Sequence, residues 1–312
     1  MRFALILPIT LLLAALVAVP AEAGVRVALS EQSARMFDDP NWQSLKLKRV
    51  RYIVPWDYAK HADHANEVGT FMNASRVSRQ EVLVTFTAPR GCFANNRYSR
   101  SSACRAPSAS AYGSAVRAFR RSYPFAKTFA PWNEVNHVSQ PTFRKPSLAV
   151  RYYDALRSAC KGCKVMAADV LDSSDVASYL RGFLRASRGR GRIWGLHNYK
   201  DVNRRQSRGL TTVLRTVPGE VWLTETGGIV KFGSDFPRSE SRAAARTKYM
   251  FQLAGRYDTR RRGLRARLTR LYVYRFYGEP SDSRFDAGLV NENGSLRSSY
   301  TQFKKYARRL PK

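Results

Sequence analysis

The stretch LSEQSARMFDDP, residues 29–40, follows the first predicted strand of the chain and contains no glycine. Two architectures alternate strands with helices along a chain: an open doubly wound sheet and a closed (β/α)8 barrel. An open sheet that binds a dinucleotide has a glycine-rich turn, GxGxxG, directly after its first strand. Because residues 29–40 lack this turn, the sequence favours the barrel.

Outward from this stretch, the same unit repeats to the end of the chain. Short β-branched runs predict eight strands, at residues 26–30, 49–54, 82–87, 127–131, 164–170, 193–198, 221–224 and 271–276. Segments with helical periodicity lie between them, and Leu148, Tyr152 and Leu156, for example, share one helix face. Eight strands with no Pro- or Ser-rich linker predict one α/β domain, a single (β/α)8 TIM barrel over residues 24–312.

Residues 1–23 have the pattern of a secretory signal peptide. Arg2 is followed by an apolar run at 4–19 and by Ala-Glu-Ala at 21–23, which is a cleavage pattern. An uncleaved membrane anchor is the alternative, but the run is short for a spanning helix of about 20 residues. We therefore expect an exported monomer, secreted or associated with the cell wall, with no transmembrane segment in the mature chain.

The chain carries 54 Lys and Arg against 23 Asp and Glu, a net charge of +31. Such a charge attracts polyanions. The basic residues are scattered and accompany no nucleic-acid-binding motif, so nucleic acid is not the expected partner. Association with an anionic cell wall and a general arginine bias explain the charge equally well.

The four cysteines form two local pairs, Cys92 with Cys104 and Cys160 with Cys163. In an exported chain such pairs favour disulfides. Only one pair has CxxC spacing, which disfavours a four-cysteine zinc site. The first bridge would close an irregular segment at the rim of the barrel. No HExxH motif exists among the histidines, so we expect no metal or other cofactor; they are His61, His64, His137 and His197.

Polar residues where barrel strands end are the candidates for function, because the loops after the strands build the site in this fold. Strand four ends in PWNEVNH (131–137), strand six in WGLHNYKD (194–201) and strand seven in VWLTETGG (221–228). Glu134 and Glu225 are the two carboxylates at the ends of strands four and seven. A facing pair of carboxylates is what cleavage of a glycosidic bond requires.

These motifs resemble clan A of the glycoside hydrolases, which are retaining enzymes on a (β/α)8 barrel. The resemblance rests on WNE, HNY and TETG, and on RFDAGLVNENGSLRSSYTQF at 284–303, and it covers nearly all of the mature chain. With VPWD at 54–57, the motifs are also similar to a group of exported actinobacterial glycosyl hydrolases. Many members of the clan have proline after the first glutamate, where this chain has Val135.

The resemblance implies that Glu134 is the general acid/base and Glu225 the nucleophile of a double displacement with retention. Their carboxyl groups should then lie about 5 Å apart. Flanking aromatic residues should desolvate Glu134 and raise its pKa, so that it holds the proton of an acid.

Further substrate-binding positions follow from the same resemblance. Asn133 matches the asparagine that contacts the sugar 2-hydroxyl, and Tyr199 matches the tyrosine that donates to the nucleophile, keeping it ionised and oriented. Arg51 matches the arginine that pairs with that carboxylate, although a shift of one residue in the strand would turn it towards the helices. His197 either binds substrate or makes a structural hydrogen bond.

Aromatic residues at strand ends offer faces on which a sugar can stack, or alternatively pack in the core. They are Trp56, Trp132, Tyr274, Phe276 and Tyr277, of which we assign Trp56, Trp132 and Phe276 to substrate binding. The sequence thus predicts a secreted retaining glycoside hydrolase acting on a poly- or oligosaccharide. The alternative is a non-catalytic, basic carbohydrate-binding protein of the cell wall on the same barrel.

Overall fold

A computed structural model describes residues 24–95, 97–259 and 261–311. The predicted signal peptide, residues 1–23, lies outside the described residues. The central sheet is parallel, and its strands are β1 (Arg26–Ser30), β2 (Arg49–Pro55), β3 (Glu81–Thr87), β6 (Thr128–Ala130), β7 (Lys164–Val165), β8 (Asp169–Leu171), β9 (Ile193–His197), β10 (Gly219–Thr226) and β12 (Ala266–Tyr274).

The barrel closes through the segment 164–171. In the sheet order β7-β6-β3-β2-β1-β12-β10-β9-β8, the two end strands are consecutive in the chain. The amide of Met166 donates to Phe129 of β6 at 2.8 Å, and the amide of the next residue, Ala167, donates to Ile193 of β9 at 2.7 Å. The fifth strand therefore changes partner halfway along its length, and the predicted (β/α)8 barrel is confirmed.

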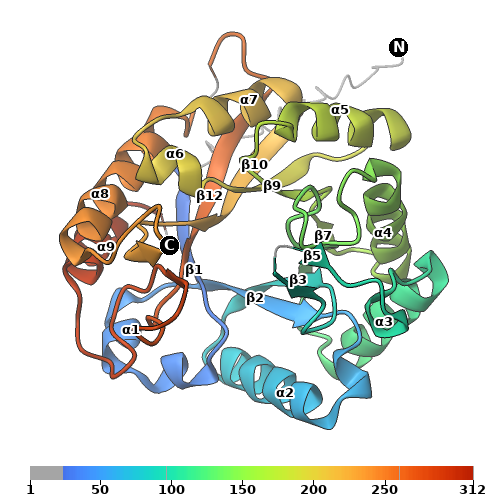
Figure 1. Ribbon diagram of the computed structural model, residues 1–312, viewed down its shortest axis with the longest axis horizontal. Helices are drawn as coiled ribbons and strands as arrows, with labels where there is room; N and C mark the ends of the chain where they lie inside the picture. The colour runs from blue at the N-terminus through green and yellow to red at the C-terminus, as the bar shows by residue number, and fades with distance from the viewer. Residues whose placement is uncertain (1–23, 96, 260, 312) are drawn as a thin grey trace, which may run out of the picture.

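Helices form a ring around these strands (Figure 1). They are α1 (Pro40–Leu45), α2 (Ala62–Val77), α3 (Ala109–Ser122), α4 (Pro146–Ala159), α5 (Val176–Ala186), α6 (Tyr199–Asn203), α7 (Arg208–Thr216), α8 (Glu240–Arg256) and α9 (Ser298–Ala307). Short 3-10 helices are η1 (Ala34–Asp38), η2 (Tyr58–Lys60) and η3 (Ser102–Cys104). In α4, Leu148, Tyr152 and Leu156 are buried, as their spacing predicts. No helix within residues 24–95, 97–259 and 261–311 is long and apolar enough to cross a membrane.

The inside of the barrel is filled with side chains in layers. A small apolar cluster occupies the middle and consists of Ala28, Leu83, Ala130, Met166, Trp222 and Tyr272. At the end where the strands begin, Arg270 and Glu81 form an ion pair at 2.6 Å. At the other end, where the strands finish, the side chains that point into the barrel are polar.

Two connections on the rim carry short strand pairs. After β3, the antiparallel strands β4 (Phe93–Ala94) and β5 (Arg97–Tyr98) lie in a loop closed by the disulfide Cys92–Cys104. After β10, β11 (Lys231–Phe232) pairs with β13 (Phe285–Asp286) from the connection after β12. A second disulfide, Cys160–Cys163, lies between α4 and β7. Both predicted disulfides are confirmed.

Candidate active site

A cavity of about 590 Å³ opens at the carboxyl ends of the strands, a size suited to a small ligand. Glu134 and Glu225 both line it, together with Asn133 and Tyr199. The remaining lining residues are Ile53, His137, Leu171, Asp172, Ser173, Lys200, Arg204, Ile229, Phe232, Asp235, Phe236, Tyr274 and Phe285. The two predicted carboxylates, far apart in the sequence, thus share one cavity.

Glu134 lies in a turn that is fixed to β8. Its φ angle is 43°, an uncommon conformation for a residue with a side chain. The next amide, that of Val135, donates to the carbonyl oxygen of Asp169 at 2.9 Å. The side chain of Asn136 bonds both the amide and the carbonyl of Leu171, at 2.8 and 3.0 Å. A proline at position 135 has no N–H to donate, so this turn accounts for valine where many clan members have proline.

Glu225 reaches the cavity because β10 is irregular. Trp222 packs inside the barrel, and Thr224 also points inward, where its hydroxyl donates to the carboxylate of Asp169. In a regular strand, in which side chains alternate, Glu225 would face the helices. A shift in register instead pairs Glu225 with His197 of β9, and irregularities of this kind re-aim a side chain.

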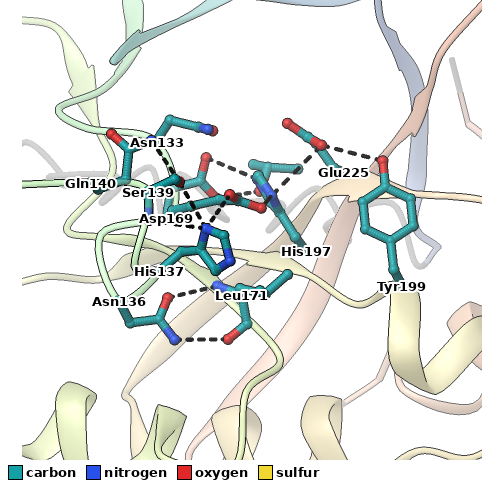
Figure 2. Close-up of polar contacts among 12 residues, drawn as sticks. Asn133, Asn136, His137, Ser139, Gln140, Asp169, Leu171, His197, Tyr199 and Glu225 are labelled. Carbon is teal, nitrogen blue, oxygen red and sulfur yellow. Dashed lines mark hydrogen bonds and ion pairs between the residues drawn. The ribbon is translucent and has the colours of Figure 1, made fainter. Parts of the chain in front are cut away.

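Arg51 is fully buried and faces the inside of the barrel. One nitrogen of its guanidinium donates to Glu225 at 2.7 Å. A second nitrogen donates to Asn133 Oδ1 at 2.7 Å and to Asp169 at 3.1 Å. The hydroxyl of Tyr199 donates to the second oxygen of Glu225 at 3.2 Å (Figure 2). Both carboxylate oxygens of Glu225 therefore have a donor, which fixes the orientation of the group.

His197 lies between three carboxylates. Its Nδ1 is 3.0 Å from Glu134 Oε1 and 3.7 Å from Glu225 Oε2, and its Nε2 is 3.4 Å from Asp169 Oδ2. Figure 2 shows the His197 side chain between Asp169 and Glu225. Burial lowers the pKa of His197, but the charges of Glu225 and Asp169 and hydrogen bonds to Asp169 and Glu134 outweigh it and raise the pKa to about 10. The side chain is therefore an imidazolium at neutral pH.

The predicted rise in the pKa of Glu134 is wrong for this site. Burial does act in that direction, but a hydrogen bond from His197 and the charges of His197 and His137 hold the pKa of Glu134 below its usual value. The aromatic neighbour invoked in that prediction, Trp132, packs on Tyr152 in the core instead. The sequence pattern identified the apolar setting but gave no sign that a cation lies 3.0 Å from this carboxylate.

Asp169 is a functional candidate that the sequence reasoning missed. It is fully buried, and burial raises its pKa, but the charges of His197 and Arg51 and hydrogen bonds from His197 and Thr224 bring the pKa below its usual value. Gly195 leaves room for the carboxylate, since a Cβ there would lie 2.1 Å from Asp169 Oδ1. The available signal was a single carboxylate inside the apolar strand 164–170.

Asp172 is a third carboxyl group on the cavity wall. Burial, with the charge of Asp201, outweighs a backbone hydrogen bond from Asp201 and raises the pKa of Asp172 to about 7. At neutral pH a substantial fraction of this group is therefore a hydrogen-bond donor. The search for polar residues directly after strands, which led to Glu134, also applies to Asp172, because Asp172 directly follows β8.

The aromatic assignments are partly wrong. Trp132 and Phe276 have no exposed surface and offer no face to a sugar. Trp132 packs against Tyr112 and Tyr152, and Phe276 packs against neighbouring aromatic rings. Trp56 is half-buried and does not line the cavity, so its role stays a prediction. The aromatic rings that line the cavity, besides that of Tyr199, are instead those of Tyr274 and of three residues that sequence reasoning missed, Phe232, Phe236 and Phe285.

The centre of the site is occupied by charged side chains that pair with one another. Arg51 occupies the space between Asp169 and Glu225. Within residues 24–95, 97–259 and 261–311, no three His, Cys, Asp or Glu side chains are arranged to hold a metal ion. The polar atoms of the site instead bond one another.

We expect His197 to keep its proton well above neutral pH. In the unfolded chain a histidine has a pKa of about 6.5. Between that value and about 10 the folded protein binds one proton more, so the free energy of unfolding should fall as the pH rises through this range. Nitrogen-15 chemical shifts of the histidine rings, with His197→Gln to assign the signal, test this directly. A neutral ring at pH values near 8 would contradict it.

Comparison with known proteins supports the fold. No family model and no curated protein matches the chain. Solved structures do: GH5_18 from Streptomyces cattleya in complex with GlcNAc is similar at TM-score 0.63 and 13% identity, over 93% of this chain and 82% of that one. The Clostridium thermocellum endo-1,4-beta-D-xylanase 10B modules, complexed with xylohexaose, match at TM-score 0.61 and 12% identity, over 93% and 67%.

A family 39 glycoside hydrolase from Bacteroides cellulosilyticus WH2 matches at TM-score 0.56 and 14% identity, over 91% of this chain and 64% of that one. These neighbours share the barrel of clan A glycoside hydrolases, as the sequence resemblance implied. At identities this low the similarity establishes the fold, and the activity has to be argued from the site.

Proposed function

We propose that this protein is a retaining glycoside hydrolase that cleaves O-glycosidic bonds of an oligo- or polysaccharide. One observation carries the proposal: two carboxylates at the ends of β6 and β10 share one cavity and one imidazole nitrogen, at 3.0 Å from Glu134 and 3.7 Å from Glu225. These two oxygens are separated by at most the sum of the two distances. That limit is close to the lower bound of roughly 6.5 Å for inverting enzymes and leaves room for the shorter spacing of retaining ones.

In the first step Glu225 is the nucleophile. Its carboxylate forms a bond to the anomeric carbon while the bond from that carbon to the leaving oxygen breaks. Arg51 and Tyr199 hold the carboxylate so that one oxygen faces the substrate. Because Glu134 is ionised and His197 is protonated before reaction, Glu134 takes the proton of His197 Nδ1 across their 3.0 Å hydrogen bond and passes it to the leaving oxygen.

In the second step Glu134 acts as the base. It removes a proton from water, the water oxygen bonds to the anomeric carbon, and the bond to Glu225 breaks. His197 and Asp169 do not touch the anomeric carbon in this scheme. They position the acid and balance the charge as the proton leaves and returns. Asn133 offers its amide nitrogen to the substrate, because its oxygen accepts from Arg51.

The class of substrate follows from the cavity and its neighbours. Aromatic rings at the wall and carboxyl groups that accept hydrogen bonds suit a sugar, which has an apolar ring face and polar edges. Two of the similar structures contain bound sugars, GlcNAc and xylohexaose. Export is part of the proposal, since the two disulfides agree with an oxidising compartment.

The test is the stereochemistry of the reaction. Proton NMR of hydrolysis, on a panel of aryl glycosides and oligosaccharides, should show a first product with the same anomeric configuration as the substrate. Inversion would exclude Glu225 as the nucleophile. Tight sugar binding without turnover across the panel would favour the alternative of a non-catalytic binding protein.

A further inference from the structure

The end of the barrel opposite the candidate active site has two adjoining hollows lined by cations. The larger, of about 750 Å³, lies between the α4–β7 and α5–β9 connections, and its cationic side chains are Arg157, Lys161, Arg188, Arg190 and Arg192. The smaller, of about 310 Å³, lies beside α3 and shares Lys161 with the first. Its other cations are Arg117, Arg120 and Arg121. Among residues 24–95, 97–259 and 261–311, no Asp or Glu lines either hollow.

Most of this charge is not neutralised by neighbouring carboxylates. Arg190 pairs with Asp154 through two bonds, at 2.6 and 2.9 Å. In the part of the chain that the structure describes, Arg157, Lys161 and Arg188 form no ion pair with a carboxylate, and all three are exposed. Solvated cations that face one concave surface attract a polyanion more strongly than the same charges spread over a convex one.

The loops that carry these cations are held in place. The Cys160–Cys163 disulfide closes the first loop. In the second, the amide of Gly189 donates to Leu184 at 2.8 Å and the amide of Arg190 donates to Ser187 at 3.2 Å. Because the backbone is already ordered, little conformational entropy is lost when a ligand binds.

The hollows lack the surface that nucleic-acid bases need. Single-stranded nucleic acids are bound by stacking their bases on exposed aromatic rings. Of the residues that the structure describes, the one aromatic residue lining the hollows is Tyr153. It is 5% exposed, and Arg157 lies over its ring at 5.4 Å. Guanidinium groups, in contrast, match the geometry of phosphate oxygens. Lys161 lines both hollows, so they lie next to each other on this end of the barrel.

We propose that these two hollows bind a linear phosphodiester polymer that carries no bases. The site does not overlap the candidate active site: the larger hollow includes Ile193, the first residue of β9, whereas His197 lies at the other end of that strand, roughly 13 Å away. A polymer bound here leaves the catalytic cavity open. The protein would thus be retained on an anionic surface with its cavity accessible to a glycan.

Poly(glycerol phosphate) of defined length, labelled with a fluorophore, is the probe, and anisotropy is measured as salt is varied. The test variant is Arg157→Gln/Lys161→Gln/Arg188→Gln. The matched control, Arg76→Gln/Lys48→Gln/Arg79→Gln, removes the same charges outside the hollows. It also matches the backbone, since Arg79 and Arg188 both have positive φ angles, 52° and 53°.

The test variant should bind at least about tenfold more weakly at low salt. A plot of the logarithm of the association constant against the logarithm of the salt concentration has a negative slope, and the magnitude of this slope should decrease by about 2, since each phosphate contact contributes roughly 0.7 for a single strand. The control should change far less. A charge-preserving variant, Arg157→Lys/Arg188→Lys, should keep the slope, which separates lost charge from lost structure.

Equal weakening in the test and control variants would overturn the proposal in favour of diffuse attraction by the net charge. Tighter binding of single-stranded DNA with the same number of phosphates would overturn it in favour of a nucleic-acid site. Hydrolysis of a small soluble glycoside should be the same in all three variants. The result is therefore independent of whether the proposed glycosidase activity is found.

Discussion

Replacement of Glu225 with glutamine is expected to lower turnover by roughly 10⁴-fold or more, because it removes the proposed nucleophile without removing its shape. The amide can still accept the hydrogen bond from Tyr199, but Arg51 loses its ion partner at 2.7 Å. Binding of sugar should persist in the variant, as measured by calorimetry with a substrate. In the shorter variant Glu225→Ala, which leaves space beside the anomeric carbon, added azide, a small anion, should restore reaction by attacking that carbon from the vacated side and giving an inverted glycosyl azide.

The control for this variant is Glu220→Gln. It makes the same chemical change on the same strand, at a glutamate that bonds Thr269 and Trp222 outside the cavity. Turnover in this control should stay close to that of the wild type. If Glu225→Gln kept a tenth or more of wild-type turnover, another residue would have to be the nucleophile.

Replacement of Glu134 with glutamine should lower turnover by about 10² to 10⁴-fold, with a loss that depends on the leaving group. A glycoside whose leaving group is already a weak base, such as a dinitrophenyl glycoside, needs no proton in the first step. For that substrate the glycosyl-enzyme should form at near wild-type speed and then accumulate, because the second step lacks its base. Stopped-flow measurement of released dinitrophenol should therefore show a burst followed by slow turnover.

Asp172→Asn is the companion experiment, because Asp172 is the carboxyl group on the cavity wall whose pKa is raised to about 7. If Glu134 is the acid, the loss in Asp172→Asn should be similar for good and poor leaving groups. If instead the dependence on leaving group appeared in Asp172→Asn and not in Glu134→Gln, the two roles would have to be exchanged.

The sequence was sufficient for the barrel because most residues of the central strands are buried on both faces, whereas the helices bury one face. Such strands appear in the sequence as short continuous apolar runs and such helices as a helical period, and both patterns can be recognised without any contact information. The division of the predicted fifth strand into β7 and β8 could not be predicted from the sequence. Residues 164–170 form one apolar run, whereas its change of partner between Met166 and Ala167 depends on which strands lie on either side.

For the candidate site, the sequence indicated where polar groups leave the strands but not how they interact. The rule of strand ends led to Glu134, Glu225 and Tyr199, which line one cavity. Asp169 lies within a strand and was missed, although its charge, together with that of Glu225, raises the pKa of His197. The predicted rise in the pKa of Glu134 was wrong because the sequence shows that its neighbours are apolar but does not show how close a cation lies to it.

Aromatic side chains were the least predictable part. Trp132 follows strand four just as Glu134 does, yet its ring stacks on Tyr152 of α4. Direction at a strand end depends on the turn that follows, and that turn is set by hydrogen bonds to β8. The phenylalanines of the cavity wall, in contrast, come from the two connections that follow β10 and β12. Phe232 in β11 and Phe236 in the loop after it belong to the first connection, and Phe285 in β13 belongs to the second, which pairs with β11.

The pairing of β1 with β12 joins Arg26–Ser30 to a strand that begins 240 residues after it, at Ala266. A chain that emerges amino end first cannot finish the barrel until this last strand has left the ribosome or the export channel. Each disulfide spans only 12 or 3 residues within a single connection. Neither bridge therefore has to wait for the first and last strands to meet.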